Sequence, residues 1–391
     1  MSSFMSTEFR FFVPPIIEFG CGKRKTVTNY AKKTGITHAL IVVDPYLLHS
    51  DYLREMIDEL NNAEIKVSYW ADVVPNPTDV SVDDAIRVYH ENGCDGIIGF
   101  GGGSAMDTAK GVAVLACSNA KSIREHCPPG WKKTEDMAPL ILVTTTAGTG
   151  AEVNPWAMIN NTETGIKGVG FNASDLIAAQ KVAIVDPELT ASMPAKLTAI
   201  TGMDAFCQVI ECYLTRTPNP VSDAIAIHAI KIASDALPRA VLNGSDIEAR
   251  EGMSLVSMMS TISFPNAGLS YPHQMSTMIY DEWGTAHGIA VAIVTRAALE
   301  LLLETKMDRL CEISKAFGIA DNGKSQLEYA LLAIEEISRF MEKIGIPTFK
   351  EATGADREQI DNLIQKVSIS GEVDQKTLED YRKILSRSLE F

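Results

Sequence analysis

The chain has 391 residues, of which 46% are apolar and 22% charged, so it can bury a large core and is not disordered. With 35 basic and 50 acidic residues its net charge is −15, which argues against nucleic-acid or anionic-membrane partners because phosphates attract clustered basic residues. No run reaches the roughly 18 apolar residues of a membrane helix, and the N-terminus lacks a signal-peptide layout. The seven scattered cysteines indicate reduced thiols, so we expect a cytoplasmic protein.

The first half of the chain alternates β-rich runs with amphipathic stretches. Strands are predicted at residues 16–19, 39–43, 66–69, 96–100, 140–144 and 182–185. Helices are predicted between them at residues 23–33, 51–61, 80–92 and 104–116. This alternation predicts a parallel sheet that is covered by helices on both faces.

The pattern changes after Asp186. Strand-like runs become rare, and helical periodicity continues to the C-terminus. Helices are predicted at residues 195–213, 221–237, 246–262, 287–303, 306–317, 325–344 and 356–366. The sequence therefore predicts two domains, an α/β domain at residues 1–186 and an all-α domain at residues 187–391.

A glycine-rich loop follows the strand predicted at 96–100. Gly102 and Gly103 precede a predicted helix, and Ser104 stands at its expected N-cap, with Asp107 three residues later as in a capping box. Free N–H groups of a first helical turn attract phosphates, and glycines let the backbone approach them. The spacing is not the G-x-G-x-x-G of Rossmann folds, so this motif alone also fits a tight turn without a ligand.

Two more segments follow predicted strands. The run TTTAGTGAE at residues 144–152 offers hydroxyl groups and glycines, which suit a pyrophosphate or ribose. Asp44 follows the second strand, where a carboxylate can accept hydrogen bonds from an adenosine ribose and repel a 2′-phosphate. Together the loops favour one long ligand, NAD rather than NADP, across the carboxyl edge of the sheet, although Asp44 before Pro45 also fits a simple turn.

Candidate metal ligands lie in the second half of the chain. Asp204 and Gln208 are four residues apart, hence on one face of a predicted helix. His273 and His287 flank a segment that we predict to be a loop. One carboxylate and two imidazoles suit Fe²⁺ or Zn²⁺, whereas either histidine taken alone also fits a structural hydrogen-bonding role.

Taken together, these segments resemble the iron-containing (group III) alcohol dehydrogenase family over nearly the whole chain. The most specific stretches are GGGSAMDTAKG (101–111), TTAGTGAEV (145–153), TGMDA (201–205), NAGLSYPHQM (266–275) and AHGIAVAI (286–293). The resemblance implies an α/β Rossmann-like dinucleotide-binding domain, then an all-α metal and substrate domain, in a dehydroquinate synthase-like architecture. It also implies NAD, Fe²⁺ or Zn²⁺, a small alcohol or aldehyde substrate, and a homodimer or larger homo-oligomer.

Site residues are carried over from this resemblance by position. The implied cofactor contacts are Asp44, Asn76, Gly102, Gly103, Ser104, Thr145, Thr149 and Lys167. Asp204, His273 and His287 match metal ligands and are the implied catalytic residues. The family has a further histidine ligand where this chain has Gln208, and a histidine often assigned to proton relay where it has Thr277. We therefore expect a weaker or zinc-preferring site, with Gln208 as a weak ligand or as a neighbour of the ligands.

The sequence thus predicts an NAD-dependent, metal-assisted alcohol dehydrogenase or aldehyde reductase. The alternatives are a non-catalytic or metal-impaired NAD-binding homologue and a lyase similar to 3-dehydroquinate synthase. Asp281, Glu282 and Trp283, with Trp156, suggest a cationic or neutral polar alcohol, although a solvated acidic loop also fits them.

Overall fold

The computed structural model describes residues 8–12, 16–127, 134, 136–166, 181–215, 219–371 and 373–391. The chain forms two compact units, one within residues 12–192 and one within residues 193–391 together with residues 8–11. Each unit has its own core, as predicted for an α/β part followed by a helical part. The functional division at residue 186 stays a prediction.

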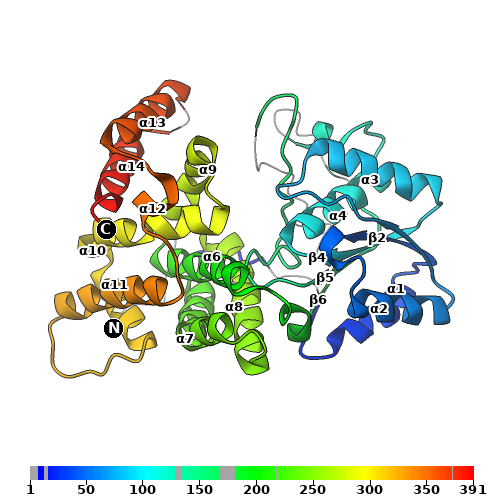
Figure 1. The fold of residues 1–391 in the computed structure, drawn as a ribbon, viewed down its shortest axis with the longest axis horizontal. Helices are drawn as coiled ribbons and strands as arrows, with labels where there is room; N and C mark the ends of the chain where they lie inside the picture. The colour runs from blue at the N-terminus through cyan, green and yellow to red at the C-terminus, as the bar shows by residue number, and fades with distance from the viewer. Residues whose placement is uncertain are drawn as a thin grey trace. The chain divides into compact units, whose positions relative to one another are not determined.

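The first unit is built on a parallel sheet (Figure 1). Its strands are β1 (Ile16–Phe19), β2 (His38–Val43), β3 (Lys66–Trp70), β4 (Gly96–Gly101), β5 (Leu140–Thr144) and β6 (Lys181–Val185). They lie in the order β1-β6-β5-β4-β2-β3, and each neighbouring pair is parallel. The inner strands are apolar and buried along their length, which is why the sequence predicts them to within about a residue.

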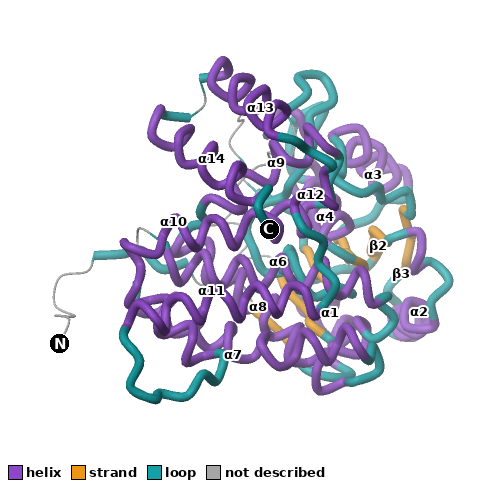
Figure 2. The backbone as a smooth tube through the Cα atoms, turned by 60° about the vertical axis from the view of Figure 1, so that its left-hand side comes forward, coloured by secondary structure: helices purple, strands orange, loops and turns teal. Residues whose placement is uncertain are grey.

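Helices cover both faces of this sheet, drawn in orange in Figure 2. Leu40 and Val42 pack with α3 (Asp79–Glu91) and α4 (Gly103–Ala116). Ile41 and Val43 point to the opposite face, as alternate residues of a strand do, and pack with α1 (Val27–Lys33) and α2 (Asp51–Asn62). Short 3₁₀ turns lie at Lys23–Thr26, Pro45–Leu47, Ile123–His126 and Pro187–Thr190.

The sheet topology brings three of the predicted ligand-binding segments to one edge. Strands β2, β4 and β5 are neighbours, and they end directly before Asp44, Gly102 and Thr145. Because the strands are parallel, all three segments leave the sheet at its carboxyl edge.

The second unit is helical, and no strand forms among its described residues. Its helices are α6 (Ala195–Leu214), α7 (Pro220–Leu242), α8 (Ile247–Ala267), α9 (Tyr271–Trp283), α10 (His287–Ala316), α11 (Gln326–Lys343), α12 (Phe349–Thr353), α13 (Arg357–Ser370) and α14 (Gln375–Ser388). Buried α6 packs against α7, α8 and α10. A separate apolar cluster joins α9 and α10 to α12, α13 and α14.

The structure differs from these expectations at α9 and at α14. The segment between His273 and His287 is mostly the helix α9 rather than a loop. The two helices predicted at 287–303 and 306–317 are confirmed, because α10 consists of two helical stretches that meet at a kink at Lys306. The helix α14 was not predicted, although its apolar residues recur every three to four positions. None of the helices in the described ranges is long and apolar enough to cross a membrane.

Candidate metal centre

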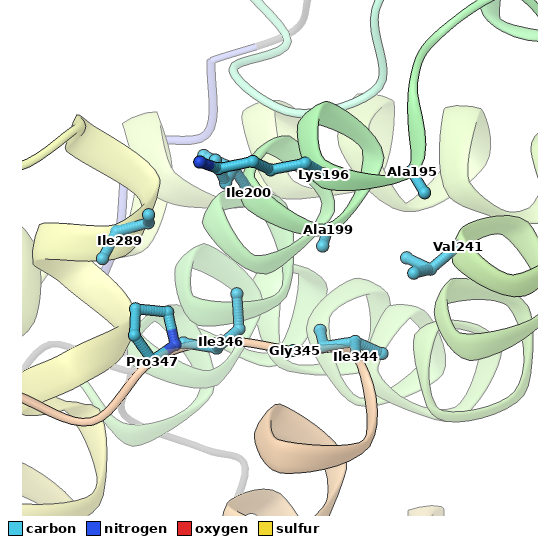
Figure 3. A pocket seen from close by; sticks show the side chains of 10 residues that line it. All are labelled: Ala195, Lys196, Ala199, Ile200, Val241, Ile289, Ile344, Gly345, Ile346 and Pro347. Atoms are coloured by element: carbon cyan, nitrogen blue, oxygen red, sulfur yellow. The ribbon is translucent and has the colours of Figure 1, made fainter. Parts of the chain in front are cut away.

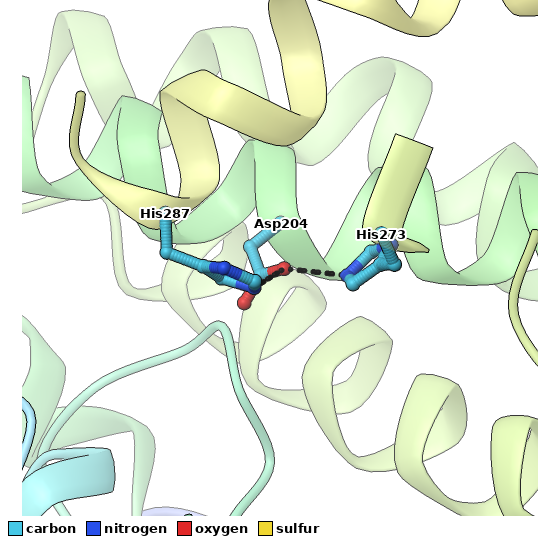
Figure 4. Close-up of side chains that lie close together, drawn as sticks. All are labelled: Asp204, His273 and His287. Atoms are coloured by element: carbon cyan, nitrogen blue, oxygen red, sulfur yellow. Dashed lines mark hydrogen bonds and ion pairs between the residues drawn. The ribbon is translucent and has the colours of Figure 1, made fainter. Parts of the chain in front are cut away.

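Three side chains from three helices of the second unit converge at one point (Figure 4). Asp204 lies in the middle of α6, His273 in the first turn of α9, and His287 at the first position of α10. Asp204 Oδ1 is 3.1 Å from His273 Nε2 and 3.6 Å from His287 Nε2. One donor atom from each residue lies within 4.8 Å of the others, so the set can hold one metal ion.

Two glycines allow α6 and α10, which carry Asp204 and His287, to pack closely against neighbouring helices. A Cβ atom on Gly202 of α6 would lie 2.3 Å from the Leu237 side chain of α7. A Cβ atom on Gly288, directly after His287, would lie 2.3 Å from the backbone oxygen of Ile200 on α6. The glycine after His287 therefore lets the start of α10 touch α6 and brings that imidazole to Asp204.

Glu211 orients His273, and the sequence reasoning missed it. Its carboxylate lies 2.5 Å from His273 Nδ1 and accepts the backbone N–H of Ser270 at 2.7 Å. Because Nδ1 contacts Glu211, Nε2 faces Asp204, which is the orientation that a metal ligand needs. The signal was available, because Asp204, Gln208 and Glu211 stand at i, i+4 and i+7 on one face of α6.

The charges around the site favour a bound cation. Burial opposes a charge on His273, but Glu211 and Asp204 outweigh that effect and raise its pKa to about 10. Burial likewise opposes ionisation of Asp204, yet the His273 hydrogen bond keeps the pKa of this carboxyl below its usual value. The surrounding protein and the neighbouring His273 lower the pKa of His287. Two carboxylates thus surround an imidazole whose proton a metal ion would replace.

Gln208 is buried beside the three ligands. Its amide nitrogen donates to Asp204 Oδ1 at 3.3 Å, and its amide oxygen accepts from the Ser260 hydroxyl of α8 at 2.6 Å. The structure therefore places this predicted metal ligand next to Asp204. The donor set of two imidazoles and one carboxylate fits Fe²⁺ or Zn²⁺, and the His287 side chain, 49% exposed, leaves one side of the set accessible.

In the first unit, the glycine loop and the threonine loop meet at the carboxyl edge of the sheet. A Cβ atom on Gly103 would lie 2.8 Å from Thr149 Oγ1, and one on Gly102 would lie 3.2 Å from Thr146. Gly102, not Ser104, is the N-cap of α4, and the predicted capping box is wrong because Asp107 instead contacts Lys110 and the Met158 backbone. With a glycine cap, the first N–H groups of α4 can face a phosphate.

The other predicted cofactor residues differ in what the structure reveals. Asp44 accepts the Tyr46 backbone N–H at 3.0 Å, the contact of a simple turn, at the edge where a ribose is expected. Asn76 is exposed after β3 in a left-handed conformation with φ of 54°, and Thr145 is anchored by its backbone to Gly101. Lys167 lies outside the described residues.

The acidic and aromatic residues between the histidines have structural partners. Glu282 pairs with Lys366 of α13 at 2.6 Å, and the Trp283 ring packs on Phe349 of α12. These contacts hold α9 to its neighbours, so neither residue supports the expected preference for a cationic alcohol. Thr277, exposed on α9, occupies the position where the family resemblance places a relay histidine.

An apolar cavity of about 390 Å³ opens in the same unit (Figure 3). Its lining is aliphatic apart from Lys196 and includes Ile200, Ile289 and Ile346. It shares no residue with the Asp204–His273–His287 set and has no pair of polar groups to orient a reacting bond, so we place the chemistry at that set instead.

Two family descriptions match consecutive parts of the chain. Residues 14–187 match "Iron-containing alcohol dehydrogenase", and residues 198–389 match "Fe-containing alcohol dehydrogenase family, C-terminal". Together they cover both units, including every candidate site residue.

Similar proteins agree with this match. The chain is 33% identical to an NAD-dependent methanol dehydrogenase of Bacillus methanolicus over 384 residues, covering 97% of this chain and 99% of that protein. It is 33% identical to a choline dehydrogenase of Bacillus subtilis, covering 90% and 87% of the two chains. A solved 1,3-propanediol oxidoreductase superposes with a TM-score of 0.90 at 30% identity, covering 97% of this chain and all of that one. The chain belongs to the iron-containing alcohol dehydrogenase family.

Proposed function

We propose that this protein is an NAD-dependent, metal-assisted dehydrogenase that interconverts a small primary alcohol and its aldehyde. The observation that carries the proposal is the convergence of Asp204, His273 and His287, with Glu211 orienting His273. The family membership and the glycine and threonine loops at the carboxyl edge of a parallel sheet support it. The relatives act on different alcohols, so their names do not choose one substrate for this chain.

Each group of residues has a distinct task in this proposal. When bound, the nicotinamide exchanges hydride with the substrate carbon, and the divalent metal polarises the substrate oxygen. Asp204, His273 and His287 hold the metal, with Gln208 as a further ligand or neighbour, and Glu211 fixes the His273 imidazole. Gly102, Gly103, Ser104, Thr145 and Thr149 bind the pyrophosphate and ribose groups, with Asn76 and Lys167 as further contacts. Asp44 favours NAD over NADP.

The alcohol proton needs a route that does not use a histidine at position 277. Thr277 stands four residues after His273, and its hydroxyl does not titrate near neutral pH. We expect the proton to leave through water.

The test is oxidation of NADH and NADPH by purified protein loaded with Fe²⁺ or Zn²⁺. The aldehydes of ethanol, 1,3-propanediol and choline, with lactaldehyde, form the substrate panel. We expect turnover with NADH and a weaker reaction with NADPH. Asp204→Ala is expected to lower kcat/KM by roughly a thousandfold, about 4 kcal/mol of transition-state stabilisation, because the carboxylate holds the metal.

The control is Asp281→Ala, which removes an exposed carboxylate of α9 that is not one of the three convergent ligands. It should keep its activity. Full activity in protein shown by elemental analysis to be free of metal would contradict the proposal. A wild-type protein that binds NADH but reduces no aldehyde would favour the non-catalytic alternative.

A further inference from the structure

The amide of Gln208 lies about as far from Asp204 Oδ1 as two ligand atoms of one metal ion lie from each other. Its amide nitrogen is 3.3 Å from Asp204 Oδ1, compared with 3.1 Å and 3.6 Å for the two imidazole nitrogens. Ligand atoms at about 2.1 Å from a tetrahedral metal are about 3.4 Å from one another. The separation of the amide from Asp204 Oδ1 therefore matches that of two ligands on one metal ion, and the orientation of the amide decides whether its oxygen or its nitrogen faces that ion.

The orientation depends on the charge that the amide faces. Beside the Asp204 carboxylate, the nitrogen is directed inward because an N–H group donates to a carboxylate. The two ends of an amide have nearly the same shape, so a half turn exchanges oxygen for nitrogen without moving other atoms. A cation on Asp204 repels the N–H group and attracts the amide oxygen, which reverses the preference.

Ser260 can satisfy the amide in both orientations. Its hydroxyl lies 2.6 Å from Gln208 Oε1 and 2.8 Å from the backbone oxygen of Ser257, one turn earlier on α8. A hydroxyl has one proton, so it fully serves one of these acceptors at a time. When it donates to Ser257, its lone pairs can accept the Gln208 N–H. Gln208, Ser257 and Ser260 are all at least 95% buried, so water does not take over this role.

We propose that Gln208 is a fourth protein ligand of the metal through its amide oxygen, and that Ser260 is the positioning residue that permits the amide to turn. The inference rests on the proposed function, in which Asp204, His273 and His287 hold a divalent metal. It assigns to this chain a neutral oxygen ligand that gives a weaker site than imidazole would.

The test measures Co²⁺ binding to chelator-treated protein, using the visible absorption of the ion as a report on its coordination. Gln208→Met keeps the length of the side chain but replaces the amide by a thioether, a poor ligand for Co²⁺. We expect it to raise the Kd for Co²⁺ roughly 10- to 100-fold, the range for lost groups around a metal, and to change the absorption band. Gln274→Met, on the exposed side of α9 next to His273, is the matched control and should change neither.

Ser260→Ala is tested in both backgrounds. In the wild type it should raise the Kd for Co²⁺ by about fivefold, as expected for one lost hydrogen bond. In the Gln208→Met variant it should have no effect on that Kd. An equal effect in the two backgrounds would overturn the role of Ser260. Circular dichroism checks folding, and Gln208→Leu replaces Gln208→Met if that variant does not fold.

The outcomes separate this inference from the proposed function. If wild type and Gln208→Met share one absorption band and their Kd values differ by less than about threefold, Gln208 is not a ligand, while the three-residue metal site stands. If the wild type binds Co²⁺ no better than Asp204→Ala, the metal site itself is wrong and both proposals are overturned.

Discussion

At the scale of single residues, the candidate metal centre depends on groups that do not touch the metal themselves. Glu211 takes one nitrogen of His273, so the other nitrogen must face Asp204. Gly288 permits the approach of α10 to α6 that brings His287 into the set. Motif matching finds the ligands, but only the contacts explain why these imidazoles point inward.

The raised pKa of His273 predicts that metal binding releases a proton. Despite its burial, Glu211 and Asp204 raise the pKa of His273 to about 10 in the metal-free protein, well above the 6.5 of a free imidazole, and a metal requires the neutral form. The pKa values of Asp204 and His287 are both lowered, so those groups are already deprotonated near neutral pH. Metal affinity should therefore rise with pH, by about tenfold per pH unit between about 7 and 9, and level off near 10.

Isothermal titration calorimetry in two buffers with different heats of ionisation measures this proton release directly. Close to one proton per Zn²⁺ is expected at pH 7.5. Glu211→Gln removes the negative charge next to His273, so it should lower the pKa of that imidazole and reduce the number of protons that metal binding releases. Zn²⁺ binding that is independent of pH between 7 and 9 would contradict the assignment.

At the scale of elements, a buried network of charged groups ties the segment after the threonine loop to α4. Lys110 of α4 is fully buried and donates to Asp107 and Asn154 at 3.1 Å and to the Trp156 backbone. Lys181 at the start of β6 donates to the backbone oxygens of Val153 and Asn154. The backbone that follows the proposed pyrophosphate loop is therefore held by two lysine side chains in the core.

Replacing Lys110 by Met should destabilise the first unit. The change leaves Asp107 buried without its ion pair, which costs about 3–5 kcal/mol, and it releases the segment that carries Asn154 and Trp156. Lys315→Met is the matched control, since Lys315 pairs with Glu312 at the same helical spacing but is exposed and should cost less than about 1 kcal/mol. Urea unfolding and NADH binding measure both variants, and equal loss of stability would show that the network is dispensable.

The elements also show which sequence signals were sufficient. Continuous apolar runs located the strands well, because a buried parallel strand is apolar on both faces. The helix α9 was missed because Pro272 and several polar residues hide its periodicity, although proline is well tolerated in a first helical turn. Ser104 was predicted as a cap because serine is a good one, whereas the turn that ends β4 places Gly102 there.

At the scale of the whole molecule, the two candidate ligand sites belong to separate compact units. The Asp204, His273 and His287 set lies within residues 193–391, whereas the glycine and threonine loops lie within residues 12–192. Each site is thus built on a core of its own.

This division predicts that the two ligands stabilise different parts of the chain. Zn²⁺ at 100 times its Kd should stabilise the helical unit by about 2.7 kcal/mol, and NADH should act on the α/β unit. Differential scanning calorimetry with each ligand alone measures the shifts, and Asp204→Ala should abolish only the shift caused by Zn²⁺. Equal displacement of the whole unfolding profile by both ligands would argue against separate sites.

The fold class, the positions of the strands and of most helices along the chain, and the convergent Asp and His residues could all be predicted from the sequence. These features follow from local periodicity and from motifs, which are readable residue by residue. The role of Glu211 and the contact of Ser260 with Gln208 became visible only in the folded structure, because they join side chains that are more than 50 residues apart along the chain. The folded structure also showed that Glu282 and Trp283 are engaged in packing, since hydrogen bonds and packing between distant helices leave no pattern in the local sequence.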